Sequence, residues 1–161
     1  VKTYLSPFPK SNRLNIIVDN ITTLYRERTE ENYIKMARVI ESSSQSIKGN
    51  LAVFFPSYDL MKRVRQYMNS IKKPIISETQ GMSKEEKSSM YQDFSSYAFN
   101  GGAVLFGVIA GSFSEGIDLP GDLLNGVIVI GLPLERPNKN SEALIEYYQQ
   151  LFGKGQDYGY I

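Results

Sequence analysis

The chain of 161 residues contains no cysteine and no histidine. Without cysteine, neither a disulfide bond nor a thiolate metal site can form. Without histidine, the chain lacks the usual general base, the Ser-His type of nucleophilic site and the commonest metal ligand. Any chemistry must therefore rest on Asp, Glu, Lys, Arg, Tyr or Ser side chains, or on the backbone.

A long apolar run and a large charge imbalance are also missing. No stretch reaches the ~18 apolar residues that a membrane span requires, and no signal-peptide pattern opens the chain, so we expect no membrane partner. The net charge is +1, whereas a free-standing nucleic-acid binder is usually more basic. Contacts with phosphate must therefore be local. A hydrophobic content of 42% indicates a globular chain, and its length fits one domain.

Hydrophobic runs alternate with segments of helical spacing. Five apolar runs read as strands, at residues 14–19, 50–57, 74–77, 103–109 and 126–132. Four segments read as helices, at residues 30–44, 60–71, 83–98 and, from a cap at Asn138 or Ser141, up to 152. The tail "GKGQDYGYI" reads as loop. This alternation predicts an α/β domain with a mainly parallel sheet flanked by helices.

One polar loop, "AGSFSEGID", directly follows a predicted buried strand. In parallel sheets, ligands bind beyond the carboxyl ends of the strands. The hydroxyls of Ser112 and Ser114 suit phosphate oxygens, and Gly116 permits a close backbone approach. Glu115 and Asp118 can accept hydrogen bonds from a ribose or an arginine. Alternatively, Asp118 only caps a turn that the glycines make.

A second polar loop, "FFPSYD", follows the predicted strand at 50–57. Ser57 can donate to a phosphate, and Tyr58 can stack on a base. The alternative is that Ser57 or Asp59 caps the next helix. If both strands are parallel, both polar loops lie at the same edge of the sheet.

A phosphate-binding P-loop is absent, because no G-x-x-x-x-G-K-[ST] occurs in the chain. The "GKGQ" at Gly153 lacks both the upstream glycine and the hydroxyl residue. The chain therefore does not by itself carry the machinery of a P-loop nucleotidase.

Four segments, in order along the chain, together resemble the second motor lobe of the XPD-type superfamily 2 DNA helicases, the iron-sulfur helicase family. "SPFPKSNRLNIIVDNITTLYRERTEENY" is similar to the first segment of that lobe, and "LAVFFPSYDLM" to motif IV. "ISETQGMSKEEKSSMYQDF" is similar to the segment before motif V. "SEGIDL" with "VIVIGLPL" resembles motif V and the strand after it. The resemblance covers nearly the whole chain and implies a RecA-like helicase C-terminal lobe.

On this resemblance, residues 1–161 are expected to form a partial second RecA-like domain, with motifs IV and V present. Motif VI, Q-x-x-G-R-x-x-R, would follow "YGYI" and is absent. Relatives often have a basic residue just before the Ser-Glu-Gly of motif V, where this chain has Phe113. A cationic DNA contact is therefore not expected at that point, although Phe113 can stack or pack instead.

The resemblance implies an ATP-driven helicase that moves five-prime to three-prime on single-stranded DNA and acts in DNA repair. ATP and Mg²⁺ would lie between this lobe and a first motor lobe, which supplies the P-loop. A [4Fe-4S] cluster would belong to the parent enzyme only. We therefore expect no catalytic residue and no metal ligand in this chain, an inactive isolated fragment, and an intracellular location, cytoplasmic or nuclear according to the source. The expected partners are single-stranded DNA and the first lobe.

The same resemblance assigns roles to particular residues. A nucleotide-binding or coupling role falls to three residues of the motif V loop, Glu115, Gly116 and Asp118. Contacts with single-stranded DNA are expected from five residues, Tyr25, Ser57, Tyr58, Ser112 and Ser114. Aromatic side chains in this set would stack on bases, and hydroxyls would hold the phosphates.

Two other classes of protein remain as alternatives. A stand-alone nucleic-acid-binding α/β module without ATPase activity is disfavoured by the near-zero net charge. A small-molecule α/β enzyme is disfavoured because the chain has no histidine, no cysteine and no P-loop.

Overall fold

The computed structural model describes residues 9–109, 118–131 and 138–159. The chain forms two compact units, which we call unit 1 (residues 1–131) and unit 2 (residues 132–161).

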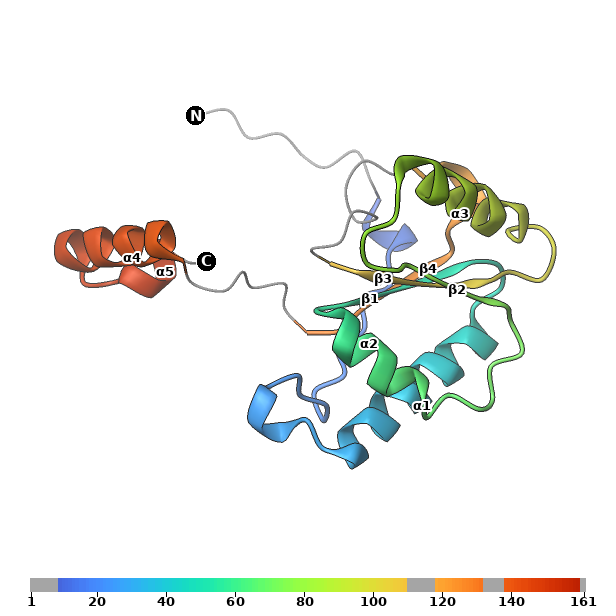
Figure 1. Ribbon diagram of the computed structural model, residues 1–161, viewed down its shortest axis with the longest axis horizontal. Helices are drawn as coiled ribbons and strands as arrows, with labels where there is room; N and C mark the ends of the chain where they lie inside the picture. Colours follow the sequence, from blue (N-terminus) through green and yellow to red (C-terminus); the bar gives the residue numbers. More distant parts are fainter. Residues whose placement is uncertain (1–8, 110–117, 132–137, 160–161) are drawn as a thin grey trace. The chain divides into compact units, whose positions relative to one another are not determined.

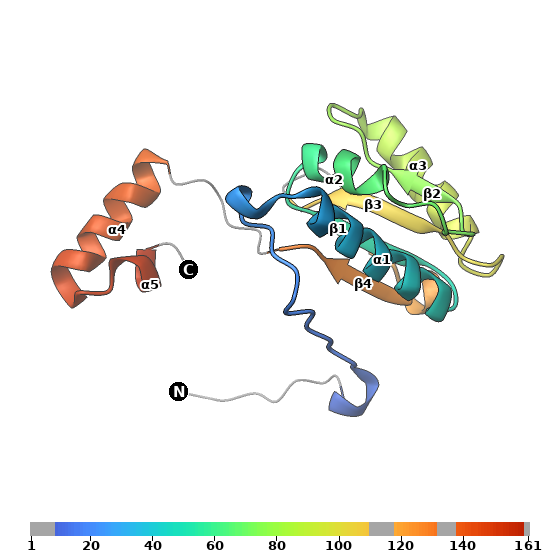
Figure 2. The same ribbon diagram turned by 90° about the horizontal axis from the view of Figure 1, so that it is seen from below.

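Unit 1 is built on a sheet of four parallel strands in the order β2-β3-β1-β4 (Figure 2). The strands are β1 (Leu51–Phe55), β2 (Ile75–Ser77), β3 (Val104–Val108) and β4 (Gly126–Val129). The central strand β1 pairs with both β3 and β4, so that Leu51 lies opposite Val104 on one side and Gly126 on the other. The predicted α/β fold with a parallel sheet is therefore confirmed.

Helices cover both faces of the sheet (Figure 1). One face carries α1 (Glu30–Ser46) and α2 (Tyr58–Arg65), and the other carries α3 (Lys84–Ser96). Three short 3-10 turns lie in the connecting segments, at η1 (Lys10–Asn12), η2 (Tyr25–Glu27) and η3 (Gly121–Leu123). Hydroxyl side chains cap the three helices, at Thr29, Ser57 and Ser83. The helix predicted from residue 83 is confirmed, and Ser83 and Glu86 form a capping box at its start by exchanging hydrogen bonds.

The core consists of two clusters, one on each face of the sheet. Residues of β1 alternate between them, since successive side chains of a strand point to opposite faces. The α1–α2 face buries Ile40, Val53, Phe55, Leu60, Val64 and Phe106, and the α3 face buries Ala52, Met90, Phe94 and Leu105. Both faces are covered, as is usual for parallel sheets.

A buried asparagine ties the amino ends of the strands together. The side chain of Asn50 is fully buried. Its Nδ2 donates to the carbonyls of Phe94 at 2.7 Å and Leu123 at 3.0 Å, and its Oδ1 accepts from the Ala103 amide at 2.8 Å. The Asn50 amide in turn donates to Oδ1 of Asn125 at 3.0 Å. Asn50 thus connects the start of β1 with the carboxyl end of α3 and with the segments that lead into β3 and β4.

Lys73 supports the same end of the sheet. Its Nζ donates to the carbonyls of Ile47 and Gly49, both at 2.6 Å. These carbonyls lie just beyond the carboxyl end of α1. Backbone carbonyls at that end of a helix have no hydrogen-bonding partner within the helix itself. Burial lowers the pKa of the Lys73 ammonium group.

The predicted strand at residues 14–19 is wrong. These residues lie outside every helix and strand, and the side chains of Leu14 and Ile17 are 84% and 90% exposed. An apolar run becomes a strand only when its backbone finds hydrogen-bonding partners, and residues 14–19 pair with none of the four strands.

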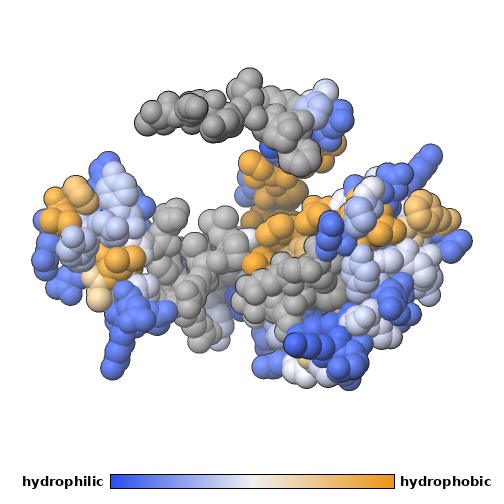
Figure 3. Space-filling model, turned by 90° about the horizontal axis from the view of Figure 1, so that it is seen from above, coloured by the Kyte–Doolittle hydropathy of each residue, from blue (hydrophilic) through white to orange (hydrophobic). Residues whose placement is uncertain are grey.

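Smaller differences concern the ends of other elements. The helix predicted at 60–71 ends at Arg65, although Tyr67 and Met68 still pack against the core. The strand predicted at 126–132 is an edge strand rather than a buried one, because Val127 and Val129 are more than half exposed. Figure 3 shows unit 1 from the side that carries α3, and hydrophobic residues are exposed on this side.

Unit 2 contains α4 (Lys139–Phe152) and α5 (Gly155–Gly159). The predicted cap is confirmed: the side chain of Asn138 accepts from the amides of Asn140 and Ser141. Gly153 ends α4 in the left-handed conformation, with φ of 66°, which favours glycine. The tail predicted as loop instead forms α5, whose Tyr158 contacts aromatic rings of α4.

We expect Asn50→Ala to lower the free energy of unfolding by about 3 kcal/mol, because several buried backbone groups lose their partner. Chemical denaturation of the purified chain measures this change. Asn69→Ala is the matched control: Asn69 is exposed, so its effect should stay within ~0.5 kcal/mol. Equal free energies for the two variants would contradict the role given to Asn50.

Candidate functional site

Two of the residues singled out in the sequence, Ser57 and Tyr58, lie at the carboxyl edge of the sheet. Ser57 and Tyr58 follow β1, and β3 ends at Val108, two residues before the predicted loop. Within that loop, the predicted site residues Ser112, Ser114, Glu115 and Gly116 lie outside the described residues. Because β1 and β3 are adjacent and parallel, the segments that follow them leave the sheet at the same edge.

Ser57 caps α2, since its Oγ accepts a hydrogen bond from the Leu60 amide at 3.3 Å. The cap uses the acceptor side of the hydroxyl, and the O–H remains a donor. Capping and a phosphate contact are therefore compatible, and the DNA contact of Ser57 stays a prediction.

Tyr58 is the first residue of α2 and is half-buried against the core cluster of α1 and α2. Its hydroxyl donates to Oε1 of Glu78 at 3.0 Å. Burial, followed by the hydrogen bond to Glu78 and the charge of that carboxylate, raises the pKa of Tyr58 to about 12. The phenol therefore remains a protonated donor at neutral pH, and only the exposed part of its ring is available for stacking.

Glu78 was not identified from the sequence. It follows β2 directly, and its side chain is 1% exposed. Its Oε2 accepts from the Val108 amide at 3.0 Å, while its own amide donates to the Phe106 carbonyl at 2.8 Å. The only sequence signal for it is a single acidic residue at the end of a short apolar run.

Tyr25 lies in η2 and is 86% exposed. The guanidinium of Arg28 lies 5.4 Å from the centroid of its ring, a cation–π contact. Just before η2, Thr23 packs beside Gly131, which follows β4. This part of the chain therefore passes the carboxyl end of β4. Tyr25 and Tyr58 make no direct ring contact with each other in the described structure.

Asp118 is exposed, and its backbone carbonyl accepts from the hydroxyl of Tyr91 at 2.8 Å. Among the described residues, no hydrogen bond or ion pair engages its carboxylate. The side chain is thus available for a partner such as an arginine or a ribose hydroxyl. Both the coupling role and the turn-cap alternative remain open.

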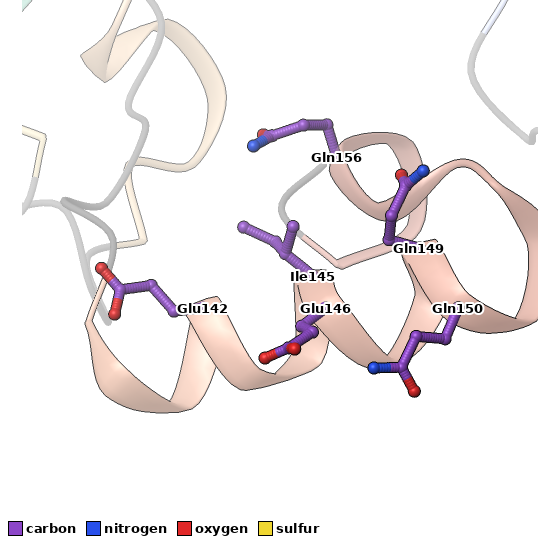
Figure 4. Close-up of a pocket in the computed structure, with 6 residues that line it drawn as sticks. All are labelled: Glu142, Ile145, Glu146, Gln149, Gln150 and Gln156. Carbon is purple, nitrogen blue, oxygen red and sulfur yellow. The ribbon is translucent and has the colours of Figure 1, made fainter.

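The described residues form two pockets large enough for a small ligand. A pocket of about 370 Å³ lies between α2 and the end of β2, where Lys62 and Arg65 face Thr79 and Gln80. A second pocket, of about 570 Å³, lies on α4 and α5 (Figure 4). Its polar side chains are those of Glu142, Glu146, Gln149, Gln150 and Gln156. Two carboxylates without a cation disfavour a phosphate ligand there.

Acidic side chains in the described ranges form no cluster that could hold a metal ion. In the same ranges, no helix combines the length and apolarity needed to cross a bilayer.

Residues 40–161 match the family model of the helicase C-terminal domain. An ATP-dependent DNA helicase chl1 of Aspergillus clavatus is 29% identical over 140 residues, which cover 76% of this chain and 19% of that protein. A probable ATP-dependent helicase of Methanocaldococcus jannaschii is 32% identical over 145 residues, which cover 82% of this chain and 20% of that protein. The chain thus spans about a fifth of the length of these relatives.

Solved structures give the same result for the fold. A structure of apo XPD matches with a TM-score of 0.59 and 26% identity, over 83% of this chain and 28% of that one. An XPD helicase structure matches with a TM-score of 0.58 and 24% identity, over 84% of this chain and 25% of that one. The resemblance derived from the four sequence segments is confirmed.

The raised pKa of Tyr58 predicts how its hydroxyl contributes to stability. Because the folded pKa of about 12 exceeds the ordinary value of 10.0, the contribution is fully present below pH 10 and is lost as the pH rises from 10 towards 12. We expect Tyr58→Phe to be less stable than the wild type at pH 8, with a difference that shrinks above pH 10.

Urea denaturation at a series of pH values measures this difference. Tyr25→Phe, at an exposed tyrosine, is the control and should match the wild type at pH 8. A wild-type advantage over Tyr58→Phe that grew between pH 10 and 12 would contradict the hydrogen bond to Glu78.

Proposed function

Because the chain belongs to the helicase C-terminal domain family and is of the XPD type, we propose that residues 1–161 form part of the second RecA-like motor lobe of an ATP-dependent DNA helicase. In this proposal the lobe contacts single-stranded DNA and forms one side of the ATP cleft. The first motor lobe of the same parent protein forms the other side.

One observation carries this proposal: the two motif segments leave the sheet from adjacent parallel strands. β1, which precedes Ser57 and Tyr58, pairs with β3, which precedes the motif V loop. The Ile109 amide donates to the Phe55 carbonyl at 2.9 Å, so the pairing continues to the end of both strands. This edge is where open parallel sheets bind their ligands. A DNA contact and a nucleotide contact can therefore be coupled over a few residues.

The proposed lobe works by holding and coupling, without covalent chemistry of its own. The hydroxyls of Ser57, Ser112 and Ser114 would hold the DNA backbone, while Tyr25 and Tyr58 would stack on bases. ATP and Mg²⁺, held chiefly by the first lobe, would supply the hydrolysis that drives movement.

The motif V carboxylates would connect the two ligands. The carboxylate of Asp118, which no other described residue engages, suits an arginine or ribose hydroxyl across the cleft, and Glu115 and Gly116 would lie beside it. We further propose five-prime to three-prime movement, a role in DNA repair and a [4Fe-4S] cluster in the parent enzyme. These three points rest on the resemblance to the family.

For the coupling role, we expect Asp118→Asn in the complete helicase to lower DNA-stimulated ATPase and unwinding by about tenfold or more, through loss of a charge-assisted contact. The melting temperature should stay nearly unchanged, because Asp118 is exposed. Binding of single-stranded DNA without nucleotide should survive. The exposed Asp93→Asn on α3 is the matched control. A large fall in melting temperature with near-normal unwinding per folded molecule would support the turn-cap alternative instead.

For the DNA path, we expect Tyr25→Ala in the complete helicase to weaken binding of single-stranded DNA by about fivefold or more, since stacking on one base is worth ~1–3 kcal/mol. Fluorescence anisotropy at fixed salt measures the dissociation constant. Phe99→Ala is the matched control, because Phe99 is also an exposed aromatic, 77% exposed, but follows α3 near the opposite end of the strands. Equal dissociation constants for Tyr25→Ala and the wild type would remove Tyr25 from the path.

A further inference from the structure

We propose that Glu78 is a positioning residue that links the start of α2 to the carboxyl end of β3, so that DNA held at Tyr58 controls the strand that carries the motif V loop. This inference rests on the function proposed above and adds to it a specific residue outside the two motifs.

Three segments meet at this one carboxylate. Oε1 accepts from the Tyr58 hydroxyl at 3.0 Å, and Oε2 accepts from the Val108 amide at 3.0 Å. The Glu78 amide donates to Phe106 at 2.8 Å, which extends the pairing of β2 with β3. The carboxylate therefore joins residues that follow β1 and β2 to the last residue of β3.

The chemistry of the two donors requires a carboxylate. Glu78 is 1% exposed, and no cation forms an ion pair with it among the described residues. Burial of an unpaired carboxylate is costly unless hydrogen bonds compensate for it. An ionised carboxylate offers an acceptor oxygen to each donor at once. A glutamine in its place has one acceptor oxygen, so it cannot accept from both the Tyr58 hydroxyl and the Val108 N–H, because its NH2 group only donates.

Packing around the carboxylate leaves it little freedom. Gly107 of β3 lies opposite Phe54 of β1. A Cβ atom at Gly107 would lie 3.1 Å from the Phe54 ring and 3.5 Å from Oε2 of Glu78. Because the space beside Gly107 is already filled, a displacement of Tyr58 is passed to Val108 rather than absorbed by rotation of the Glu78 side chain.

A purely structural role is the competing explanation, since a buried hydrogen-bonded carboxylate also stabilises a fold. The two explanations differ in what a mild substitution does. A structural role predicts a loss of stability with normal activity per folded molecule. A positioning role predicts a loss of coupling between DNA and ATP hydrolysis at temperatures where the protein is fully folded.

The test compares Glu78→Gln, Tyr58→Phe and the double variant in the complete helicase, well below their melting temperatures. Tyr58→Phe removes the hydroxyl but keeps the ring for stacking, and it is the milder change if Glu78→Gln folds poorly. Ser77→Ala is the matched control, because the Ser77 Oγ is buried, precedes Glu78 in the chain and has no hydrogen-bond partner among the described residues. ATPase with and without single-stranded DNA, unwinding rate and DNA affinity are measured for each.

We expect both single variants to lower the DNA-stimulated ATPase rate and the unwinding rate by about tenfold. In Glu78→Gln, ATPase without DNA and the affinity for single-stranded DNA should change less than about twofold, and Ser77→Ala should match the wild type. Because both variants interrupt the same connection from Tyr58 through Glu78 to Val108, the double variant should be no slower than the slower single variant.

Wild-type rates per folded molecule in Glu78→Gln and Tyr58→Phe, or additive losses in the double variant, would overturn this inference alone. If the wild-type enzyme itself shows no DNA-stimulated ATPase, the proposed function fails and the inference fails with it. The wild-type measurement therefore separates the two failures.

Discussion

The sheet of unit 1 depends on the hydrogen bonds of Asn50. Parallel strands are joined by long crossovers, so nothing in the ladder itself aligns the segments that enter each strand. The Asn50 amide does this from a fully buried position, by bonding to Phe94, Ala103 and Leu123. A neutral amide suits this task because it donates and accepts without placing a charge in the core. Lys73 adds a second tie at the same end.

The carboxyl edge follows a different principle. The residue that links this edge is Glu78, a buried carboxyl group, and its partners Tyr58 and Val108 lie at the ends of the two strands that precede the proposed motif segments. A polar group in a buried site is sensitive to small changes of geometry, because each lost hydrogen bond leaves a buried donor or acceptor without a partner. The edge that we propose as functional is thus held by hydrogen bonds whose loss is costly.

Local sequence patterns predicted much of this fold. The remaining features depend on contacts between residues that lie far apart in the sequence. Helical spacing and the capping residues Ser83 and Asn138 located helices correctly, because a cap and its helix are neighbours in the chain. The apolar run at 14–19 looked like a strand but has no strand beside it in the described structure. Glu78 escaped notice because its partners lie 20 and 30 residues away and form no sequence pattern. Of the candidate site, Ser57 and Tyr58 follow β1 at the expected edge. The helix cap formed by Ser57 was one of the two alternatives weighed for it, but the Glu78 partner of Tyr58 was not foreseen.

The two ends of the sheet are attached by different contacts. A strand that is fixed at its amino end and rotates there moves most at its carboxyl end. Asn50 and Lys73 fix the amino ends, while five-residue strands such as β1 and β3 extend roughly 16 Å from that base. A tilt of about 5° at the base moves the far end by roughly 1.4 Å over this length. That displacement is enough to break or form a hydrogen bond, whose useful range spans only about 0.5 Å. Small rotations of the base are therefore amplified where the motif segments begin.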